Sequence, residues 1–241
     1  MWPLKNNKNQ YMKLLNLALL SVCSLQLSFS QSLKYADGSS QNMSNVFVNI
    51  NSTESSTIKG SKYLNEEFIS TKISSMPDQV FGVRYNIYDD EMEFQGADNT
   101  VYALNKNDTS VKITFTATNE SYNIFSYIDD TGRQKKGYFV KLNNEGENLM
   151  LRKHRIVFFE EQASKTGYDA PKPAMYKNVK DRMYIKLANK EAVLLPTKKK
   201  KLAKTLFSEN SKIILDFINS NKIKLSKEAD LITFINYLNT L

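Results

Sequence analysis

Residues 60–94 read GSKYLNEEFISTKISSMPDQVFGVRYNIYDDEMEF, and this stretch decides the fold class. Between residues 81 and 87, apolar side chains alternate with polar or small ones, which is typical of a strand that buries one face. Asp89 and Asp90 interrupt the alternation, and residues 92–94 resume it. This order predicts a β-hairpin with Asp-Asp at its turn.

Further strand patterns follow the hairpin at the spacing of an antiparallel meander. We expect strands at residues 101–104, 111–117, 122–128, 137–142, 148–153, 155–161, 182–187 and 191–195. The unbroken apolar run within 155–161 predicts a central strand covered on both faces. Residues 162–178 contain Gly167, two prolines and the tyrosines Tyr168 and Tyr176, which indicates a long loop, and such loops often carry function.

The pattern changes after Pro196, where apolar residues recur at helical spacing. Four lysines at 198–201 precede a short helical segment, and Ser208 and Ser226 are the predicted N-caps of two further helical stretches. The fold class is therefore mainly β (α+β). We expect an antiparallel meander or curved sheet of about eight to ten strands, followed by a C-terminal helical pair against the sheet or its rim.

Residues 1–30 show the three regions of a secretory signal peptide. Residues 1–13 contain three lysines and no acid, and a mostly apolar run follows at 14–27. Ser28 and Ser30 then provide the small residues that a signal peptidase recognises. The run is too short and too polar for a transmembrane helix, which needs roughly 20 residues. We expect export, cleavage after Ser30, and translation from Met1 or Met12.

The rest of the chain divides into a flexible leader at 31–58 with one short strand, an antiparallel β domain at 59–196 and a helical segment at 197–241. Cys23 is the only cysteine and lies within the signal. It is either discarded with that segment or lipidated, and Val22 before it favours the first alternative. A mature chain without cysteine has no disulfide and no thiolate.

The formal net charge is +8, and removing the signal leaves about +5, a mildly basic balance that does not indicate a nucleic-acid partner. The segments GSKYLNEEF at 60–68, VRYNIYDDEMEF at 83–94 and DLITFINYLNTL at 230–241 resemble uncharacterised exported β-rich proteins of flavobacteria and related Bacteroidota. The resemblance covers most of the chain after residue 58. It implies a fold and a compartment, and it carries over no catalytic residue, because that group has no established activity.

Asp89 and Asp90 belong to the densest acidic cluster of the sequence. Paired carboxylates hydrolyse glycosidic bonds or bind hard cations such as calcium. Adjacent acids at a hairpin tip normally point into water, so we interpret them as turn residues. Glu66 and Glu67 are interpreted as a structural cap or an interface.

His154 is the only histidine, and its flanking cations, Lys153 and Arg155, are expected to lower its proton affinity. We interpret it as a solvent-facing residue. Lys198 and Lys199 either start a solvated helix or meet anionic lipid headgroups. Glycine-rich phosphate loops and the HExxH, GxSxG and CxxC motifs do not occur in the sequence, so we expect no enzyme, no cofactor and no metal.

The sequence predicts an exported, non-enzymatic cell-envelope protein that binds a partner protein or a surface polymer. Its location would be the periplasm, the outer-membrane periphery or the extracellular space, with no membrane span in the mature chain. The candidate contact residues are Tyr168, Tyr176, Asp89, Asp90, Lys198 and Lys199. The alternative is a periplasmic carrier that holds an apolar ligand such as a lipid in a curved sheet. The aromatic residues expected to line that cavity are Phe115, Phe125, Tyr127, Phe139 and Phe158.

Overall fold

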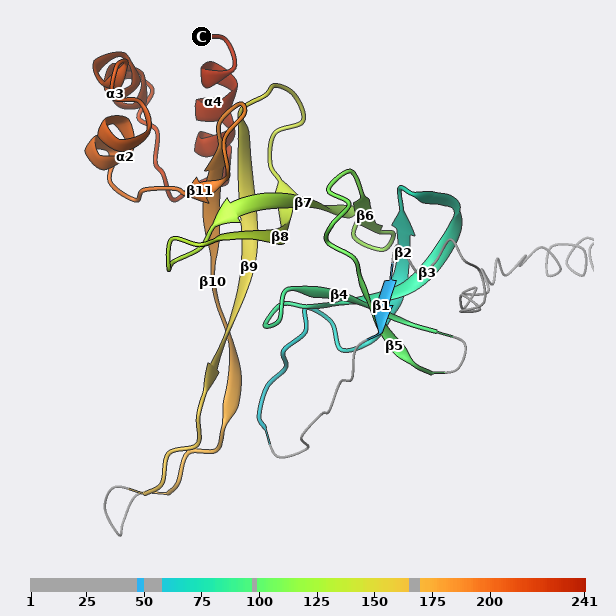
Figure 1. The fold of residues 1–241 in the computed structure, drawn as a ribbon. Coiled ribbons are helices and arrows are strands. Elements are labelled where there is room, and N and C mark those ends of the chain that lie inside the picture. The colour runs from blue at the N-terminus through green and yellow to red at the C-terminus, as the bar shows by residue number, and fades with distance from the viewer. Residues whose placement is uncertain (1–46, 50–57, 97–98, 165–169) are drawn as a thin grey trace, which may run out of the picture. The chain divides into compact units, whose positions relative to one another are not determined.

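The computed structural model describes residues 47–49, 58–96, 99–164 and 170–241, which all belong to one compact unit, Leu33–Leu241. Their strands are β1 (Phe47–Asn49), β2 (Ile69–Ile73), β3 (Met76–Asn86), β4 (Glu91–Gln95), β5 (Val101–Leu104), β6 (Lys112–Phe115), β7 (Glu120–Ile128), β8 (Gln134–Lys141), β9 (Leu149–Phe159), β10 (Met175–Lys186) and β11 (Val193–Leu194). These described strands form one 11-stranded sheet in the order β1-β5-β4-β3-β2-β6-β7-β8-β9-β10-β11, with antiparallel ladders throughout (Figure 1). The predicted mainly antiparallel sheet followed by helices is confirmed.

The predicted hairpin with Asp-Asp at its turn is formed by β3 and β4, and Asp90 has a positive φ of 57°. The sequence prediction missed β2, and it recognised β3 only from residue 81, although that strand begins at Met76. Adjacent Ser70 and Thr71 hid β2: Thr71 is fully buried, and its hydroxyl donates to the Ile69 carbonyl at 2.9 Å. A polar side chain that hydrogen-bonds the nearby backbone can be buried in a strand, but it interrupts the apolar alternation by which a strand is recognised in a sequence.

The main core lies inside the curl of the sheet, where alternate side chains of β3, β4, β6, β7 and β8 meet. Its largest fully buried side chains include Tyr85, Tyr122 and Tyr138, and the Tyr85 ring contacts each of the other two edge to face. In strand order β2, β6 and β7 separate β3 from β8. The turn after β3 nevertheless reaches β8, because Asp90 accepts the Tyr138 backbone N–H at 3.4 Å. The sheet is therefore curled strongly enough to meet itself.

Strands β9 and β10 are 11 and 12 residues long and pair along their length, with a register shift between Val179 and Arg182. The predicted break within β9 does not occur. The prediction of a central strand at 155–161 is also wrong, because residues 155–159 pair only with β10 and Phe159 is 44% exposed. The loop predicted at 162–178 is shorter, since β10 begins at Met175.

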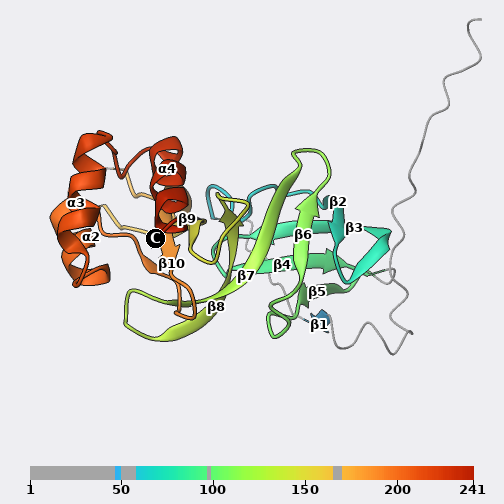
Figure 2. The ribbon, with the colours of Figure 1, turned by 90° about the horizontal axis from the view of Figure 1, so that it is seen from above.

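Three helices follow the sheet rather than a pair: α2 (Lys199–Leu206), α3 (Ser211–Ser220) and α4 (Glu228–Leu238). Figures 1 and 2 show them beside β9, β10 and β11, and a second core joins them to Met150 and Ile185. Neither serine is a cap: α3 starts after Asn210 and α4 after Lys227, without side-chain capping bonds.

Local turns explain both differences. The Asn210 N–H bonds the Phe207 carbonyl at 3.0 Å, which extends the loop beyond Ser208. Asp230 accepts the Lys224 N–H at 2.8 Å, and this bond holds the entry to α4 in place of a Ser226 cap. None of the described helices is both long and apolar enough to cross a membrane.

Candidate functional site

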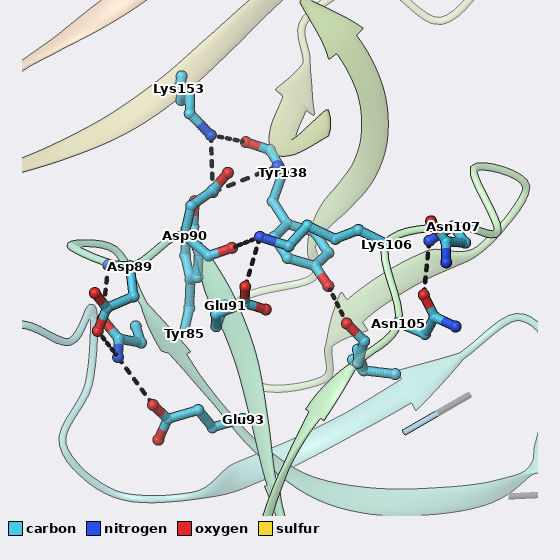
Figure 3. Close-up of polar contacts among 12 residues, drawn as sticks. Tyr85, Asp89, Asp90, Glu91, Glu93, Asn105, Lys106, Asn107, Tyr138 and Lys153 are labelled. Carbon is cyan, nitrogen blue, oxygen red and sulfur yellow. Dashed lines mark hydrogen bonds and ion pairs between the residues drawn. The ribbon is translucent and has the colours of Figure 1, made fainter. Parts of the chain in front are cut away.

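The turn between β3 and β4 places its two acids in different environments (Figure 3). Asp90 points toward β8 and β9, and its carboxylate is 17% exposed. Its Oδ1 lies 2.7 Å from the Lys153 ammonium and accepts the Tyr85 hydroxyl at 2.7 Å. The expectation that this acid points into water is therefore wrong, because bonds to three neighbouring donors hold it against the sheet.

The Lys153 ammonium that pairs with Asp90 also donates to the Tyr138 carbonyl at 3.2 Å. Burial lowers the pKa of Lys153, and the Asp90 carboxylate acts in the opposite direction. A Cβ on Gly137 would lie 2.6 Å from Asp90 Oδ2 and 2.7 Å from Lys153 Nζ. The ion pair fits here because residue 137 has no side chain.

Asp89 is exposed and behaves as the predicted turn residue. Its Oδ2 accepts the Asn86 amide at 2.9 Å, and its own N–H donates to Asn86 Oδ1 at 3.1 Å. The same amide donates to Glu93 at 2.9 Å. Asp89 thus fixes the turn while one side of its carboxylate faces solvent.

A cleft of about 280 Å³ lies beside this turn. We call it the basic cleft, because its charged lining comprises Lys106, Lys135, Lys136, Lys153, Arg155, Asp89 and Asp90. The β3–β4 turn, the loop after β5, the start of β8 and the middle of β9 supply these residues. Tyr88 and His154 also line it.

Three aromatic rings, which we call the aromatic trio, lie next to the cleft: Tyr88, Phe158 and Tyr176. The ring centroids of Tyr88 and Tyr176 are 5.1 Å apart, and those of Phe158 and Tyr176 are 5.0 Å apart. Tyr88 is 45% exposed although it is large and aromatic. The structure therefore brings the predicted contact residue Tyr176 close to the predicted acidic turn.

A second hollow, of about 560 Å³, begins on the other side of Tyr176. We call it the groove, and its lining is Ile58, Gly60, Ser61, Lys62, Tyr63, Glu66, Glu67, Phe68, Arg84, Gln95 and Tyr176. The Arg84 guanidinium lies 3.9 Å from the Tyr63 ring centroid and 4.6 Å from that of Phe68, a cation–π arrangement. The exposed side chains of Glu66 and Glu67 give this hollow its acidic rim.

The groove wall is tied to both neighbouring strands. Lys59 exchanges backbone hydrogen bonds with residues 174 and 176, at 2.9 and 2.8 Å, and Ile87 donates to the Lys62 carbonyl at 2.9 Å. Gly60 has a φ of 76°, and a Cβ there would meet the Tyr176 carbonyl. The segment thus requires glycine where it crosses the start of β10.

The other predicted contact residues do not join this surface. Lys198 and Lys199 lie at the start of α2, and neither lines the groove or the basic cleft. Lys199 lies 3.5 Å from Asn219 Oδ1 on α3. Tyr168 lies outside the described residues.

His154 is not solvent-facing, so that prediction is wrong: its side chain is 14% exposed. Its Nδ1 lies 3.0 Å from Asp181 Oδ2, and its Nε2 lies 3.0 Å from the Tyr122 hydroxyl. That hydroxyl donates to Glu120 at 2.7 Å. Burial disfavours the charged ring, but the carboxylates of Glu120 and Asp181 outweigh it and raise the pKa of His154. Sequence neighbours on β9 point to the opposite face, which is why its flanking cations do not dominate.

The network around His154 is structural. The Tyr122 hydroxyl that joins His154 to Glu120 belongs to a side chain that is 1% exposed. Arg152 extends the network by ion pairs to Glu120 on β7 and, at 2.9 Å, to Glu228 in the first turn of α4. These contacts fasten the helices to the sheet.

The five aromatic residues proposed for a carrier cavity do not lie together. Phe115 belongs to the main core, Phe125, Tyr127 and Phe139 pack in a separate cluster, and Phe158 belongs to the aromatic trio. Within the described residues, no three histidine, aspartate or glutamate side chains are placed to hold a metal ion together.

Comparison with protein-family models, with curated proteins and with solved structures found no match for this chain. The resemblance to exported proteins of Bacteroidota therefore stays a prediction.

The cations of the basic cleft and the ring of Tyr88 were not predicted as site residues. Lys153 and Arg155 are two positions apart on one strand and so share a face, which is a signal the sequence contained. Lys106 and Lys136 come from distant segments, and only the curl of the sheet brings them together.

Proposed function

We propose that this chain is an exported, non-enzymatic cell-envelope protein that holds a surface polymer along the groove, the aromatic trio and the basic cleft. One observation carries the proposal. Tyr176 lines the groove, Tyr88 lines the basic cleft, and their rings are in contact at 5.1 Å. An extended ligand can therefore lie in both hollows without leaving the aromatic surface between them.

The chemistry of this surface supports a binding role. Exposed aromatic rings supply large contact area at low entropic cost, and the polar side chains around them fix orientation. Two hollows in series suit a chain-like ligand better than one compact molecule. A partner protein with an extended segment is the alternative ligand, and protease treatment of the envelope fraction separates a polymer from a protein.

The environments of the acids support a non-enzymatic role. A general acid or base must reach the reacting group of a substrate. The carboxylate of Asp90 is bonded to Lys153 and Tyr85, and that of Glu93 pairs with Arg84 at 2.8 Å and is 1% exposed. These acids are engaged in holding the β3–β4 hairpin.

Export is supported by the composition of residues 1–30, where lysines, an apolar run and small residues follow one another. The compartment beyond the inner membrane is where a surface polymer is available, so the two parts of the proposal agree.

Binding of the mature protein to the polymer fraction of its host's envelope tests the proposal. The variant Tyr88→Ala/Tyr176→Ala should bind at least about tenfold more weakly, because tyrosine side chains at contact surfaces dominate contact energies. The matched control is Phe159→Ala/Met175→Ala, a cross-strand pair on the opposite face of the same two strands. It removes comparable apolar surface and should leave binding within about twofold.

Equal weakening in the two double variants would contradict the proposal, as would no weakening in either. Protease treatment of the envelope fraction separates the ligand classes. Binding that survives it supports a polymer, and binding that disappears identifies a partner protein instead.

A further inference from the structure

We infer that the basic cleft binds anionic groups, so that the part of the polymer that lies in this cleft bears phosphate, sulfate or carboxylate groups. The inference rests on the proposed function in treating the cleft as one end of the ligand path. It adds the chemical class of the ligand.

The charge of the lining is the first argument. Five cationic side chains, Lys106, Lys135, Lys136, Lys153 and Arg155, face two carboxylates, Asp89 and Asp90. Cations that converge on one concave surface raise the local concentration of anions. A neutral ligand would gain only hydrogen bonds from this arrangement, whereas an anion gains charge attraction as well.

The partners of these cations locate the excess charge. Carboxylates neutralise three of them: Lys106 pairs with Glu91 at 2.8 Å, Lys135 with Asp129 at 2.9 Å and Lys153 with Asp90 at 2.7 Å. Among the described residues, the one hydrogen-bond partner of the Lys136 ammonium is the Asn107 carbonyl, at 3.3 Å. Arg155 has no ion pair with a carboxylate in the part of the chain that the structure describes. The positive charge without a carboxylate partner therefore lies at Lys136 and Arg155, and Asp89, whose carboxylate accepts the neutral Asn86 amide, opposes part of it.

The paired lysines contribute a fixed donor and a buried charge. An ammonium group has three N–H donors. Lys153 uses two acceptors, Asp90 and the Tyr138 carbonyl, and Lys106 likewise uses Glu91 and the Asp90 carbonyl, the latter at 2.6 Å (Figure 3). Lys106, whose side chain is 21% exposed, retains a donor for a ligand oxygen and is held in place beforehand, which reduces the entropy lost on binding. Lys153 is buried, with its ammonium 4.7 Å from the Phe139 ring centroid, and it contributes charge to the cleft.

Dextran sulfate and neutral dextran of equal length are the probes. We expect the wild-type mature protein to bind dextran sulfate and not dextran at low salt. Lys136→Gln/Arg155→Gln should weaken binding of dextran sulfate at least about tenfold, because it removes the positive charges of the cleft that have no carboxylate partner. The control Lys198→Gln/Lys199→Gln makes the same change in net charge at α2 and should weaken binding less than about twofold.

If Lys136→Gln/Arg155→Gln and Lys198→Gln/Lys199→Gln weaken dextran sulfate binding equally, the inference is overturned. The polyanion would then be attracted by the net charge of the protein and not by the basic cleft. Equal binding of the two dextrans would overturn it as well. Titration with the host's envelope polymer keeps the two proposals separable. If Tyr88→Ala/Tyr176→Ala weakens that binding and Lys136→Gln/Arg155→Gln does not, the inference fails and the proposed function stands. If neither variant weakens it, both fail.

Discussion

The two halves of the β9–β10 pair differ in what they bury. In the inner half, residues 149–153 pair with 182–186, and Met150, Leu151 and Ile185 are fully buried. In the outer half, residues 155–159 pair with 175–179, and the apolar side chains there are half-buried or exposed. The register shift between Val179 and Arg182 marks the boundary.

The difference shows that apolar content alone does not tell a core strand from a contact surface. The inner half lies between the helices on one face and the cluster around Phe139 and Tyr184 on the other. In the described part of the chain, no further strand pairs with β9 along the outer half, and the aromatic residues there are half-buried or exposed. We assign stability to the inner half and ligand contact to the outer half.

The largest expected effect is on stability in the inner half. Leu151→Ala should lower the free energy of unfolding by about 2–5 kcal/mol, because it leaves a cavity at a fully buried position. Phe159→Ala in the outer half should cost less than about 1 kcal/mol, since it removes only a cross-strand contact. Urea denaturation measures both. Similar losses in the two variants would break the proposed division of roles.

A smaller loss is expected at Gly137, which lies against the ion pair that closes the curl. Gly137→Ala should destabilise the protein by about 1–3 kcal/mol, because the added methyl group displaces Asp90 and Lys153. Gly132→Ala is the control, since a Cβ at that exposed glycine meets no atom within 4 Å. Its positive φ of 78° costs some strain by itself, so an equal loss in the two variants would show that the ion pair does not matter.

The sequence predicted the sheet wherever apolar alternation was clean, as in β3 and β6, and it predicted the Asp-Asp turn. It could not predict β2, where Thr71 is buried, or the outer half of β9, where an apolar run is left uncovered. At the site, Asp89, Asp90 and Tyr176 were found as polar or aromatic residues in turns and loops. Asp90 is held against β8 and β9, and His154 contacts β7 and β10. These strands are distant in sequence from the residues they bury, so the local sequence pattern could not predict the burial.

A still smaller effect on stability is expected at His154, which links β9 to Asp181 on β10 and to Tyr122 on β7. The folded-state pKa of His154 is raised, so its stabilising contribution is complete below its unfolded value of about 6.5 and is lost as the pH rises through the folded value. Glu120 stays charged in this range, because His154 and Tyr122 hold the pKa of Glu120 to about 2. The stability difference between wild type and His154→Gln should therefore shrink between about pH 5.5 and pH 9. Urea denaturation across this range measures it, and a constant difference would contradict the assignment.

The smallest effect is on affinity at Asp89, whose carboxylate opposes an anionic ligand in the basic cleft. Asp89→Asn keeps an oxygen acceptor for Asn86 and should strengthen dextran sulfate binding about two- to threefold at low salt. The gain should vanish near 1 M salt, where charges are screened within about 3 Å. Asp216→Asn on the exposed face of α3 makes the same charge change and should have no comparable effect. Weaker binding by Asp89→Asn would argue against an anionic ligand.

Chemical-shift mapping with the host's envelope polymer tests the central claim most directly. Titration into the isotope-labelled mature protein should perturb the amides of residues 60–68, of Tyr88 and Tyr176, and of Arg155, as one contiguous path. Perturbations confined to α2, α3 and α4, or to the buried inner half of β9 and β10, would contradict the proposal that this path is the binding surface.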